Sequence, residues 1–541
     1  MAVENLITEH IDIWTSAVKT KSTSGRGSSK KLELYGVKKL RELILELAVR
    51  GKLVPQDPND EPATVLLERI AQEKAQLIKD KKIKKTKPLS SVKEQEKTFD
   101  IPRGWSWTQI GLITTFVNGF AFKSSSFQDS GVGIVKIGDI SFAGELTPNT
   151  MSRVDTSVIK DLDPSLRVNR GDMVIAMSGA TTGKVGFNTT NEVFYLNQRV
   201  GKFIPHQIDL DYLFFPLTTK IAENLEKSLG SAIPNLSTGQ INDIVIALPP
   251  LQEQHRIVAK VDELMTLCDQ LEQQTEASIE AHQVLVTTLL NTLTNSADAD
   301  ELMQNWARIS EHFDTLFTTE ESIDQLKQAI LQLAVMGKLV SFGNSRKTML
   351  KELLSFGPRN GLSPKEAPSR TELKVLKLGA TSYGSLDLEQ SKYIDVDIKD
   401  KPYLCLTRGD ILIQRGNSAN FVGSNVLIQE DYHNYIYPDL MMKLRVNQLI
   451  SPEFLSLVLS ANASREHMWK QMTGTSGTMP KISKKVVEGL PVTFPTNKNI
   501  QVEVVSQTNK LIALCDKLRT RLTGCSETKA TLCDVMTQQA Y

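Results

Sequence analysis

The sequence predicts an α/β (α+β) protein with internally duplicated half-chains, in which long antiparallel coiled-coil helices separate two globular domains. Three observations lead to this prediction. Two helical segments far apart in the chain are nearly identical, a β-rich block follows each of them, and a heptad-spaced helix follows each block. Both halves present these features in the same order, so we expect one structural unit to be used twice.

The first shared feature is an amphipathic helix that ends in Gly-Lys-Leu-Val. Residues 37–54 (VKKLRELILELAVRGKLV) align without a gap to residues 323–340 (IDQLKQAILQLAVMGKLV), and ten of the eighteen positions are identical. Apolar residues recur every three or four positions in both copies, which is typical of an amphipathic helix. Gly51 and Gly337 stand where a helix would close in a left-handed cap, so we interpret the Gly-Lys pair as a helix end and not as a phosphate site.

The second shared feature is a β-rich block with an Arg-Gly-Asp turn. VNRGDMVIAMSG (168–179) matches LTRGDILIQRGN (406–417), and in each case the turn leads into an alternating apolar run, which predicts a strand. Both blocks are rich in Gly, Ser, Thr and Asn, and both end in a Pro-bounded strand. We therefore predict two compact domains, at 101–250 and 346–495, with a common frame and different loops.

The third shared feature is a long helix with apolar residues at heptad spacing. The seam of the first helix consists of Ile257, Val261, Leu264, Cys268 and Leu271. The seam of the second consists of Val504, Thr508, Leu511, Cys515, Leu518, Leu522 and Cys525. Two such seams predict an antiparallel coiled coil in which the helices bury each other. The remaining predicted regions are an N-terminal helical region with a charged linker (1–100), a central helical spacer (251–345) and a C-terminal coiled-coil helix (496–541).

The composition excludes several classes of protein. The 541 residues carry a net charge of +1, and no apolar run approaches the roughly 18 residues of a membrane span. The N-terminal residues lack the basic and apolar regions of a signal peptide. Five cysteines are scattered without a Cys-x-x-Cys pair, so we expect reduced thiols and no zinc site. These features predict a cytoplasmic protein that contacts no membrane.

No motif predicts a catalytic centre. SGATTGKVG (178–186) is similar to a phosphate-binding loop, but it has three residues between its glycines and a valine after the lysine, where that loop needs four residues and a Ser or Thr. The seven histidines stand singly, and no paired carboxylates with a nearby lysine indicate a nuclease. We therefore predict no catalytic, cofactor-binding or metal-binding residue in this chain.

Basic and amide side chains in the two β-rich blocks are suited to DNA, because Arg and Lys hold phosphates or guanine edges and Asn and Gln pair with adenine. The predicted DNA-binding residues are Lys123, Lys184, Asn197, Gln198, Arg199 and Lys202 in the first block, and Arg415, Asn417, Asn420, Lys481, Lys484 and Lys485 in the second. Each of them taken singly also fits a solvated surface residue. The lysine-rich segment 79–88 is either a phosphate contact or an exposed helix end.

The chain resembles the specificity subunits of type I restriction–modification systems. The resemblance is carried by LPPLQEQHRIVAKVDELMTLCDQLEQQ (248–274), by the twice-used LAVxGKLV, by VPQDPNDEPATVLLERIAQEKAQL (54–77) and by IPRGWSWTQIG (101–111). It covers the chain from about residue 37 onward. The second half lacks both a second IPxGW and the PLxEQ phrase, where it reads FPTNKNIQVEVVSQ (494–507).

The resemblance implies that each β-rich block is a target recognition domain that reads one half of a split, asymmetric sequence in double-stranded DNA. It also implies two modification subunits, which bring S-adenosylmethionine and methylate adenine, and restriction subunits, which use ATP and Mg²⁺ for translocation and cleavage. The chain itself would be non-enzymatic and bind no cofactor. Seats for the two modification subunits, with packing inside this chain as the alternative, are predicted at Leu47, Val49, Leu53, Leu333, Val335 and Leu339.

Two other classes of function fit the residues less well. One is a stand-alone methyltransferase or nuclease with divergent motifs, and the other is a coiled-coil scaffold without a DNA role. Under the favoured interpretation the long helices act as a ruler. A helix of about 40 residues spans roughly 60 Å, which exceeds the roughly 34 Å between half-sites one turn apart on B-DNA.

Overall fold

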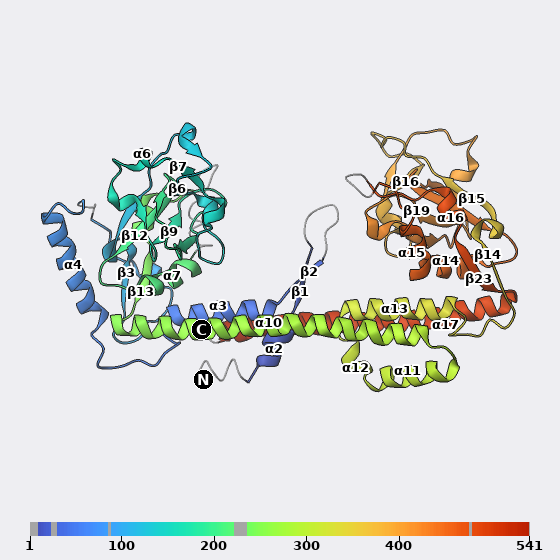
Figure 1. Ribbon diagram of the computed structural model, residues 1–541, viewed down its shortest axis with the longest axis horizontal. Helices are drawn as coiled ribbons and strands as arrows, with labels where there is room; N and C mark the ends of the chain where they lie inside the picture. The colour runs from blue at the N-terminus through green and yellow to red at the C-terminus, as the bar shows by residue number, and fades with distance from the viewer. Residues whose placement is uncertain (1–8, 23–29, 85–87, 221–234, 475–478, 540–541) are drawn as a thin grey trace. The chain divides into compact units, whose positions relative to one another are not determined.

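The computed structural model describes residues 9–22, 30–84, 88–220, 235–474 and 479–539 (Figure 1). The chain forms two compact units. Unit 1 comprises Met1–Lys19, Leu34–Thr275 and Lys529–Tyr541, and unit 2 comprises Thr20–Glu33 and Glu276–Thr528. Each unit draws residues from both halves of the chain, because the two longest helices, α10 (Leu251–Asn295) and α17 (Lys498–Gln539), contribute to both.

Three sheets form the β-rich domain of unit 1 (Figure 1). Their strand orders are β10-β9-β12-β4, β5-β7-β6-β11-β8 and β13-β3. β12 is antiparallel to both β9 and β4, whereas β11 is parallel to β6. Ile134, Val174 and Phe194 represent the core that the two larger sheets share. The strands are β3 (Ser106–Gln109), β4 (Thr114–Asn118), β5 (Phe127–Gln128), β6 (Val132–Val135), β7 (Ser152–Val154), β8 (Arg167–Val168), β9 (Met173–Ala176), β10 (Val185–Phe187), β11 (Phe194–Leu196), β12 (Val200–Pro205) and β13 (Val245–Leu248).

The β-rich domain of unit 2 repeats this topology, except that unit 1 adds β5 at one edge. Its strand orders are β20-β19-β22-β15, β17-β16-β21-β18 and β23-β14. β22 is antiparallel to both β19 and β15, and β21 is parallel to β16. The strands are β14 (Ser345–Met349), β15 (Leu354–Asn360), β16 (Lys374–Leu376), β17 (Ser391–Tyr393), β18 (Cys405–Leu406), β19 (Ile411–Gln414), β20 (Asn425–Leu427), β21 (Tyr432–Ile436), β22 (Met441–Val446) and β23 (Pro491–Pro495). The predicted duplication is confirmed.

The helices extend the correspondence. α7 follows β12 in unit 1, and α14 follows β22 in unit 2; α9 and α16 then precede the last strand of each domain. The other elements of the first half are α2 (Ile11–Ser16), β1 (Lys19–Ser22), β2 (Lys30–Glu33), α3 (Tyr35–Val49), α4 (Ala63–Lys79), α5 (Ile110–Ile113), α6 (Thr156–Ile159), α7 (Leu210–Thr219) and α9 (Thr238–Asn242). The second half contains α11 (Ala299–Glu311), α12 (Phe313–Leu316), α13 (Glu320–Val335), α14 (Pro452–Ser460), α15 (Asn462–Trp469) and α16 (Lys484–Glu488). Within the described ranges, no helix has the length and apolar character needed to cross a membrane.

In unit 1, the repeated helix α3 lies against the first part of α10. Arg41 Nη2 of α3 is 2.7 Å from the carboxylate of Asp269 and 2.8 Å from that of Glu272. Cys268, the neighbour of Asp269, is only 1% exposed, which is the burial expected for a residue on the packed seam. The phrase Leu-Cys-Asp therefore serves the packing of the repeated helix.

Unit 2 contains the equivalent arrangement, formed by the repeated helix and the long helix of the second half. Lys327 of α13 forms an ion pair with Asp516 of α17, and the neighbouring Cys515 is buried. Cys515 shares a core with Leu326 of α13 and Val286 of α10. The α17 seam therefore packs against the repeated helix α13 and against the part of α10 that follows the predicted α10 seam.

The Gly-Lys pair ends the repeated helix in the predicted way. Gly51 and Gly337 have positive φ angles of 68° and 71°, and the N–H of the lysine after each glycine bonds to the carbonyl five residues before it, at 2.9 Å in both copies. Lys338 has a second role, because its Nζ donates to the carbonyls of Thr294 (2.7 Å) and Ser296 (2.8 Å) at the end of α10. The lysine thus satisfies carbonyls that a helix end leaves without a partner.

Candidate nucleic-acid interface

Loops gather at one edge of the four-stranded sheet of unit 1. Val200 pairs with Ala176 and Gly201 pairs with Asn118, so the ends of β9 and β4 and the start of β12 lie at the same edge. The loop 177–184, which joins β9 to β10, leaves from this edge. The turn before β12 is tied to it, because the Met177 N–H donates to the carbonyl of the residue preceding β12 at 2.9 Å.

Four of the predicted DNA-binding residues of unit 1 lie on these loops. Lys123 is exposed on the chain that leaves β4, and Gln198 and Arg199 are exposed in the turn before β12. Asn197 is half-buried, and its Oδ1 accepts a hydrogen bond of 2.8 Å from the backbone N–H of Gln198. Asn197 therefore shapes the turn, while the other three side chains face solvent.

The other two predicted DNA-binding lysines of unit 1 are buried, and the expectation for them is corrected. Lys184 is 7% exposed and donates through Nζ to the Ile140 carbonyl at 2.7 Å; burial lowers the pKa of this amine. Lys202 is 5% exposed, donates to the Arg167 carbonyl at 2.5 Å and lies 3.0 Å from the Asp172 carboxylate. Both amines are engaged inside the domain, where they do not reach a phosphate.

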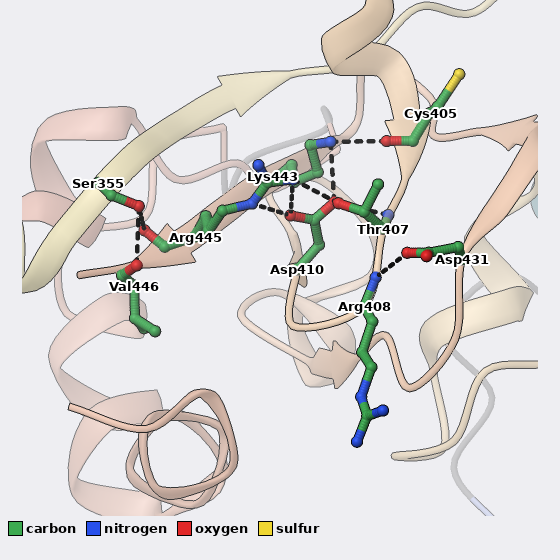
Figure 2. A network of polar contacts seen from close by, with 9 residues as sticks. All are labelled: Ser355, Cys405, Thr407, Arg408, Asp410, Asp431, Lys443, Arg445 and Val446. Atoms are coloured by element: carbon green, nitrogen blue, oxygen red, sulfur yellow. Dashed lines mark hydrogen bonds and ion pairs between the residues drawn. The ribbon is translucent and has the colours of Figure 1, made fainter. Parts of the chain in front are cut away.

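The aspartate of each Arg-Gly-Asp turn joins such a buried lysine in a polar network. In unit 2, Asp410 is fully buried, and its carboxylate lies 3.0 Å from Lys443 Nζ and 2.7 Å from Arg445 Nη2 (Figure 2). It also accepts the backbone N–H of Thr407 at 3.0 Å, which closes the turn. Lys443 and Lys202 occupy matching positions on β22 and β12, so both domains contain the Asp–Lys pair of this network.

The arginine of the turn points away from the network. Arg408 is exposed, its backbone N–H donates to Asp431 at 2.8 Å, and its guanidinium extends away from Asp410 (Figure 2). Arg170 of unit 1 is also exposed, and its Nη1 donates to the Asn191 side chain at 3.0 Å. Each turn thus keeps its carboxylate inside and its guanidinium at the surface.

The matching edge of unit 2 carries the loop 415–424 between β19 and β20. Arg415 is half-buried, with its N–H bonded to the carbonyl of Leu440 and its carbonyl bonded to the N–H of Ile482, both at 2.8 Å. Asn417 is also half-buried and donates through Nδ2 to the Gln414 side chain at 2.7 Å. The backbone of Arg415 therefore holds the loop beside the segment that contains Ile482.

The remaining candidates of unit 2 are exposed. Asn420 lies on the loop 415–424, and Lys481 forms a β-bridge with Gly416 of that loop. Lys484 and Lys485 are the first two residues of α16. Residues 475–478, which precede Lys481 in the chain, lie outside the described residues.

The lysine-rich segment of the first half follows the helix α4, which is fastened to the β-rich domain. Lys74 Nζ donates to the carbonyls of Gly111 (2.7 Å) and Thr114 (2.8 Å), and burial lowers the pKa of this amine to about 8. Glu73 accepts from Gln207 at 2.6 Å. In the segment itself the lysines at 79, 81, 82 and 84 are exposed, and residues 85–87 lie outside the described residues.

The residues predicted to bind partner subunits are buried or half-buried in this chain, which favours the alternative prediction of packing inside the chain. Leu47, Val49 and Leu53 are 3–7% exposed, and Leu333 is 8% exposed. Val335 and Leu339 are half-buried against the core of unit 2. The apolar stripe of each repeated helix covers its own unit, because a helix with one apolar face stabilises a fold by burying that face.

Sequence reasoning missed a pair of equivalent glutamines at the starts of the two long helices. Gln254 donates to the Pro249 carbonyl at 3.0 Å, and its Oε1 accepts the N–H of Asp209, the N-cap of α7, at 2.9 Å. Gln501 donates to the Pro495 carbonyl at 2.9 Å and accepts the N–H of Ser451, the N-cap of α14, at 2.8 Å. The sequence signal for these anchors was a proline at the end of a strand with a glutamine five or six residues later.

The phrases that carry the family resemblance meet in unit 1. Trp105 Nε1 donates to Glu253 at 3.0 Å, and Gln56 donates to the same carboxylate at 2.6 Å. Burial raises the pKa of Glu253, although both hydrogen bonds favour its charged form. Unit 2 has no IPxGW phrase, and there the Phe342 ring packs against Gly337, where a Cβ would meet it at 2.9 Å.

Among the described residues, no group of three or more His, Cys, Asp and Glu side chains is placed to hold a metal ion. The residues brought together at the two sheet edges are basic and amide side chains, which are suited to phosphates and base edges.

Comparisons with known proteins agree with this arrangement. Residues 102–281 match the family model of the type I restriction modification DNA specificity domain. The chain is 35% identical to the Type I restriction enzyme EcoEI specificity subunit and 35% identical to the EcoAI specificity subunit, both from Escherichia coli, with 100% of each chain covered. A chain from "Structural basis underlying complex assembly and conformational transition of the type I R-M system" shares the fold, with a TM-score of 0.50 at 16% identity over 82% of this chain and 98% of that one. The chain therefore belongs to the type I restriction enzyme specificity subunits.

Proposed function

We propose that this chain recognises a split, asymmetric sequence in double-stranded DNA, with one β-rich domain for each half of the sequence. The observation that carries the proposal is the shared topology of the two domains combined with their different loops. At matching sheet edges, unit 1 presents Gln198 and Arg199 while unit 2 presents Arg415 and Asn420. A shared domain topology that carries two different sets of polar side chains suits the recognition of two different DNA half-sequences.

The DNA-contacting residues are those whose side chains reach solvent at or beside these edges. Phosphate contacts set affinity and register, and base-edge contacts set sequence preference. The set comprises Lys123, Gln198, Arg199, Arg415, Asn417, Asn420, Lys481, Lys484 and Lys485, with Asn197 as the residue that shapes its turn. Lys184 and Lys202 support the domain from inside instead.

The chain acts in this proposal as the non-catalytic subunit of a cytoplasmic restriction–modification complex. Two modification subunits bind it and bring S-adenosylmethionine and the adenine methylation site, while restriction subunits use ATP and Mg²⁺. The duplicated helices α3 and α13 support a count of two, because equivalent helices give two copies of one partner equivalent surroundings. Since the apolar faces of these helices are buried, the partners contact other surfaces of the chain.

Methylation mapping across a genome, with and without this gene and with its modification subunits present, tests the proposal. The expected result is a two-part motif that disappears with the gene. Exchange of residues 101–250 for those of another specificity subunit is expected to change one half of the motif only. A continuous motif, or a change in both halves, would contradict the assignment of one domain to each half. Tight binding of S-adenosylmethionine by the chain alone would contradict its non-catalytic role.

A further inference from the structure

Each β-rich domain holds one aromatic ring almost entirely in solvent. Phe142 is 92% exposed and Tyr383 is 83% exposed. Among the described residues, the next most exposed large hydrophobic side chain is Met303, at 66%. Single exposed apolar residues are ordinary on protein surfaces, so exposure by itself does not indicate a binding site. The positions of these two rings in the fold are the informative observation.

The two rings occupy equivalent positions in the duplicated fold. β6 and β16 are the strands that run parallel to β11 and β21 in the two domains. Each strand is followed by Lys-x-Gly, beginning at Lys136 and at Lys377, and the aromatic residue stands six positions after that lysine in both cases. The loops around the rings differ in sequence, yet both domains place an aromatic side chain at this point.

Both loops are fastened by a buried polar side chain from the neighbouring hairpin. In unit 1, Lys184 Nζ donates to the Ile140 carbonyl at 2.7 Å and lies 3.8 Å from the centroid of the Phe142 ring. In unit 2, Gln414 is fully buried, and its Nε2 donates to the Leu378 carbonyl at 2.9 Å and also to two hydroxyl groups of the same loop. Two different side chains thus anchor the equivalent loop in the two domains, and the ring of each loop lies outside.

The hairpins that fasten the rings also carry the candidate DNA loops. Lys184 ends the loop 177–184, and Gln414 precedes the loop 415–424. The Tyr383 ring meets Phe421 of that second loop edge-on, with a centroid distance of 5.8 Å. The Tyr383 ring therefore lies against the loop that carries Asn420, and the Phe142 ring lies at Lys184, the last residue of loop 177–184.

An exposed ring on an anchored loop next to a candidate DNA loop suits one occupant, the base stack of a duplex. Apolar side chains that enter between base steps unstack them partially and bend the DNA, and aromatic rings stack on bases of any sequence. A sequence-tolerant contact also explains why the ring recurs in two domains whose loops otherwise differ. We propose that Phe142 and Tyr383 are aromatic wedges, each of which enters a base step of its own half-site; this inference rests on the proposed function.

The test uses the complete chain with its modification subunits and duplexes that contain the mapped target. The duplexes carry 2-aminopurine at successive positions outside the methylated adenine, so that local unstacking raises fluorescence. The variants are Phe142→Ala and Tyr383→Ala, with Phe142→Trp and Tyr383→Phe as ring-preserving partners and Met303→Ala as an exposed apolar control. All three positions are at the surface, so equal melting temperatures of the five variants and the wild-type complex verify folding.

Wild-type complex is expected to raise fluorescence at one step in each half-site. Phe142→Ala should remove the signal in one half and Tyr383→Ala in the other, each with about tenfold weaker binding, as the loss of one base–aromatic stack implies. The ring-preserving variants and Met303→Ala should behave as wild type. Unchanged fluorescence in both alanine variants would overturn the wedge, even if binding weakened. Failure of the wild-type complex to prefer its target over unrelated DNA would overturn the proposed function instead.

Discussion

The buried carboxylate of the second Arg-Gly-Asp turn gives a sharp test of what holds the recognition domains together. Asp410 is 0% exposed, and its partner Lys443 is 1% exposed. Replacing Asp410 by alanine leaves the lysine amine buried without its counter-charge, although its hydrogen bond of 2.8 Å to the Cys405 carbonyl is retained. Removal of one member of a buried ion pair typically lowers the free energy of unfolding by about 3–5 kcal/mol, and the closed turn also loses its bond to Thr407.

The matched variant is Asp172→Ala in unit 1. There the carboxylate side chain is 25% exposed, so water screens the ion pair more than in unit 2. We expect a loss of about 1–3 kcal/mol in the free energy of unfolding, the range for leaving a buried donor without one of its partners. Asp400→Ala, at an exposed position of unit 2, is the control and should change nothing measurable.

Hydrogen–deuterium exchange of individual peptides is the suitable assay, because a chain with two units need not unfold in one step. For Asp410→Ala, exchange in β19 and β22 should accelerate roughly a hundredfold to a few thousandfold, at 1.4 kcal/mol for each factor of ten. The double variant Asp410→Leu/Lys443→Met should recover most of the loss, since apolar replacements of a buried pair are often neutral. Equal acceleration in the Asp410 and Asp172 variants would refute the reasoning that burial sets the strength of these networks.

Three further predictions concern DNA contact, a helix end and pH. Arg199→Ala should alter only the half-sequence that unit 1 recognises, and Lys481→Ala should reduce the slope of log affinity against log salt concentration by about one. Lys202→Met should destabilise the domain without changing that slope. Equal salt slopes for Lys481→Ala and the wild type would contradict a phosphate contact. Lys338→Met removes the hydrogen bonds to the Thr294 and Ser296 carbonyls, which should lower the local free energy of opening by about 1–2 kcal/mol. Hydrogen–deuterium exchange at the end of α10 should then accelerate by about tenfold. Lys338→Arg should retain part of the protection. Burial lowers the pKa of His206 from 6.5, so the unfolded chain binds the proton more readily and unit 1 should lose stability as the pH falls below 6.5. The difference between the urea midpoints of unfolding at pH 7.5 and pH 5.5 should be smaller in His206→Asn than in the wild type. An undiminished difference in that variant would exclude this histidine as the cause.

The duplicated scaffold explains where the two halves of the sequence are most alike. The identical stretch around LAVxGKLV builds a helix, its left-handed cap and a lysine side chain that in unit 2 closes the end of α10. These requirements are internal to the fold and the same in both units. The loops at the sheet edges have no such requirement, so their sequences differ between the two units. Recognition of two different DNA half-sequences needs this difference.

The second half retains the contacts of the first without retaining its phrases. Gln501 anchors the start of α17 as Gln254 anchors α10, although the preceding proline is six residues away instead of five. Phe342 occupies the space beside Gly337 that Trp105 occupies beside Gly51. Side chains of different sequence spacing can reach the same place once a helix and a strand are fixed, so motif matching does not detect the equivalence.

The sequence by itself determined the duplication, the order of the elements, the glycine caps and the general position of the polar loops. These follow from local patterns, because periodicity, turn residues and caps act over a few neighbouring residues. The target recognition role came from phrases that resemble the specificity subunits, and the family comparison bore that resemblance out.

Only the tertiary structure decided which charged residues face the solvent. Arg199 and Lys202 are three residues apart in one basic phrase, yet Arg199 is exposed in a turn and Lys202 is buried on β12 beside Asp172. A lysine on a strand has the same local sequence signature whether its amine meets water or a distant carboxylate. The outcome depends on which sheet covers that face and on where the chain returns a residue 30 positions away, and both are properties of the assembled fold.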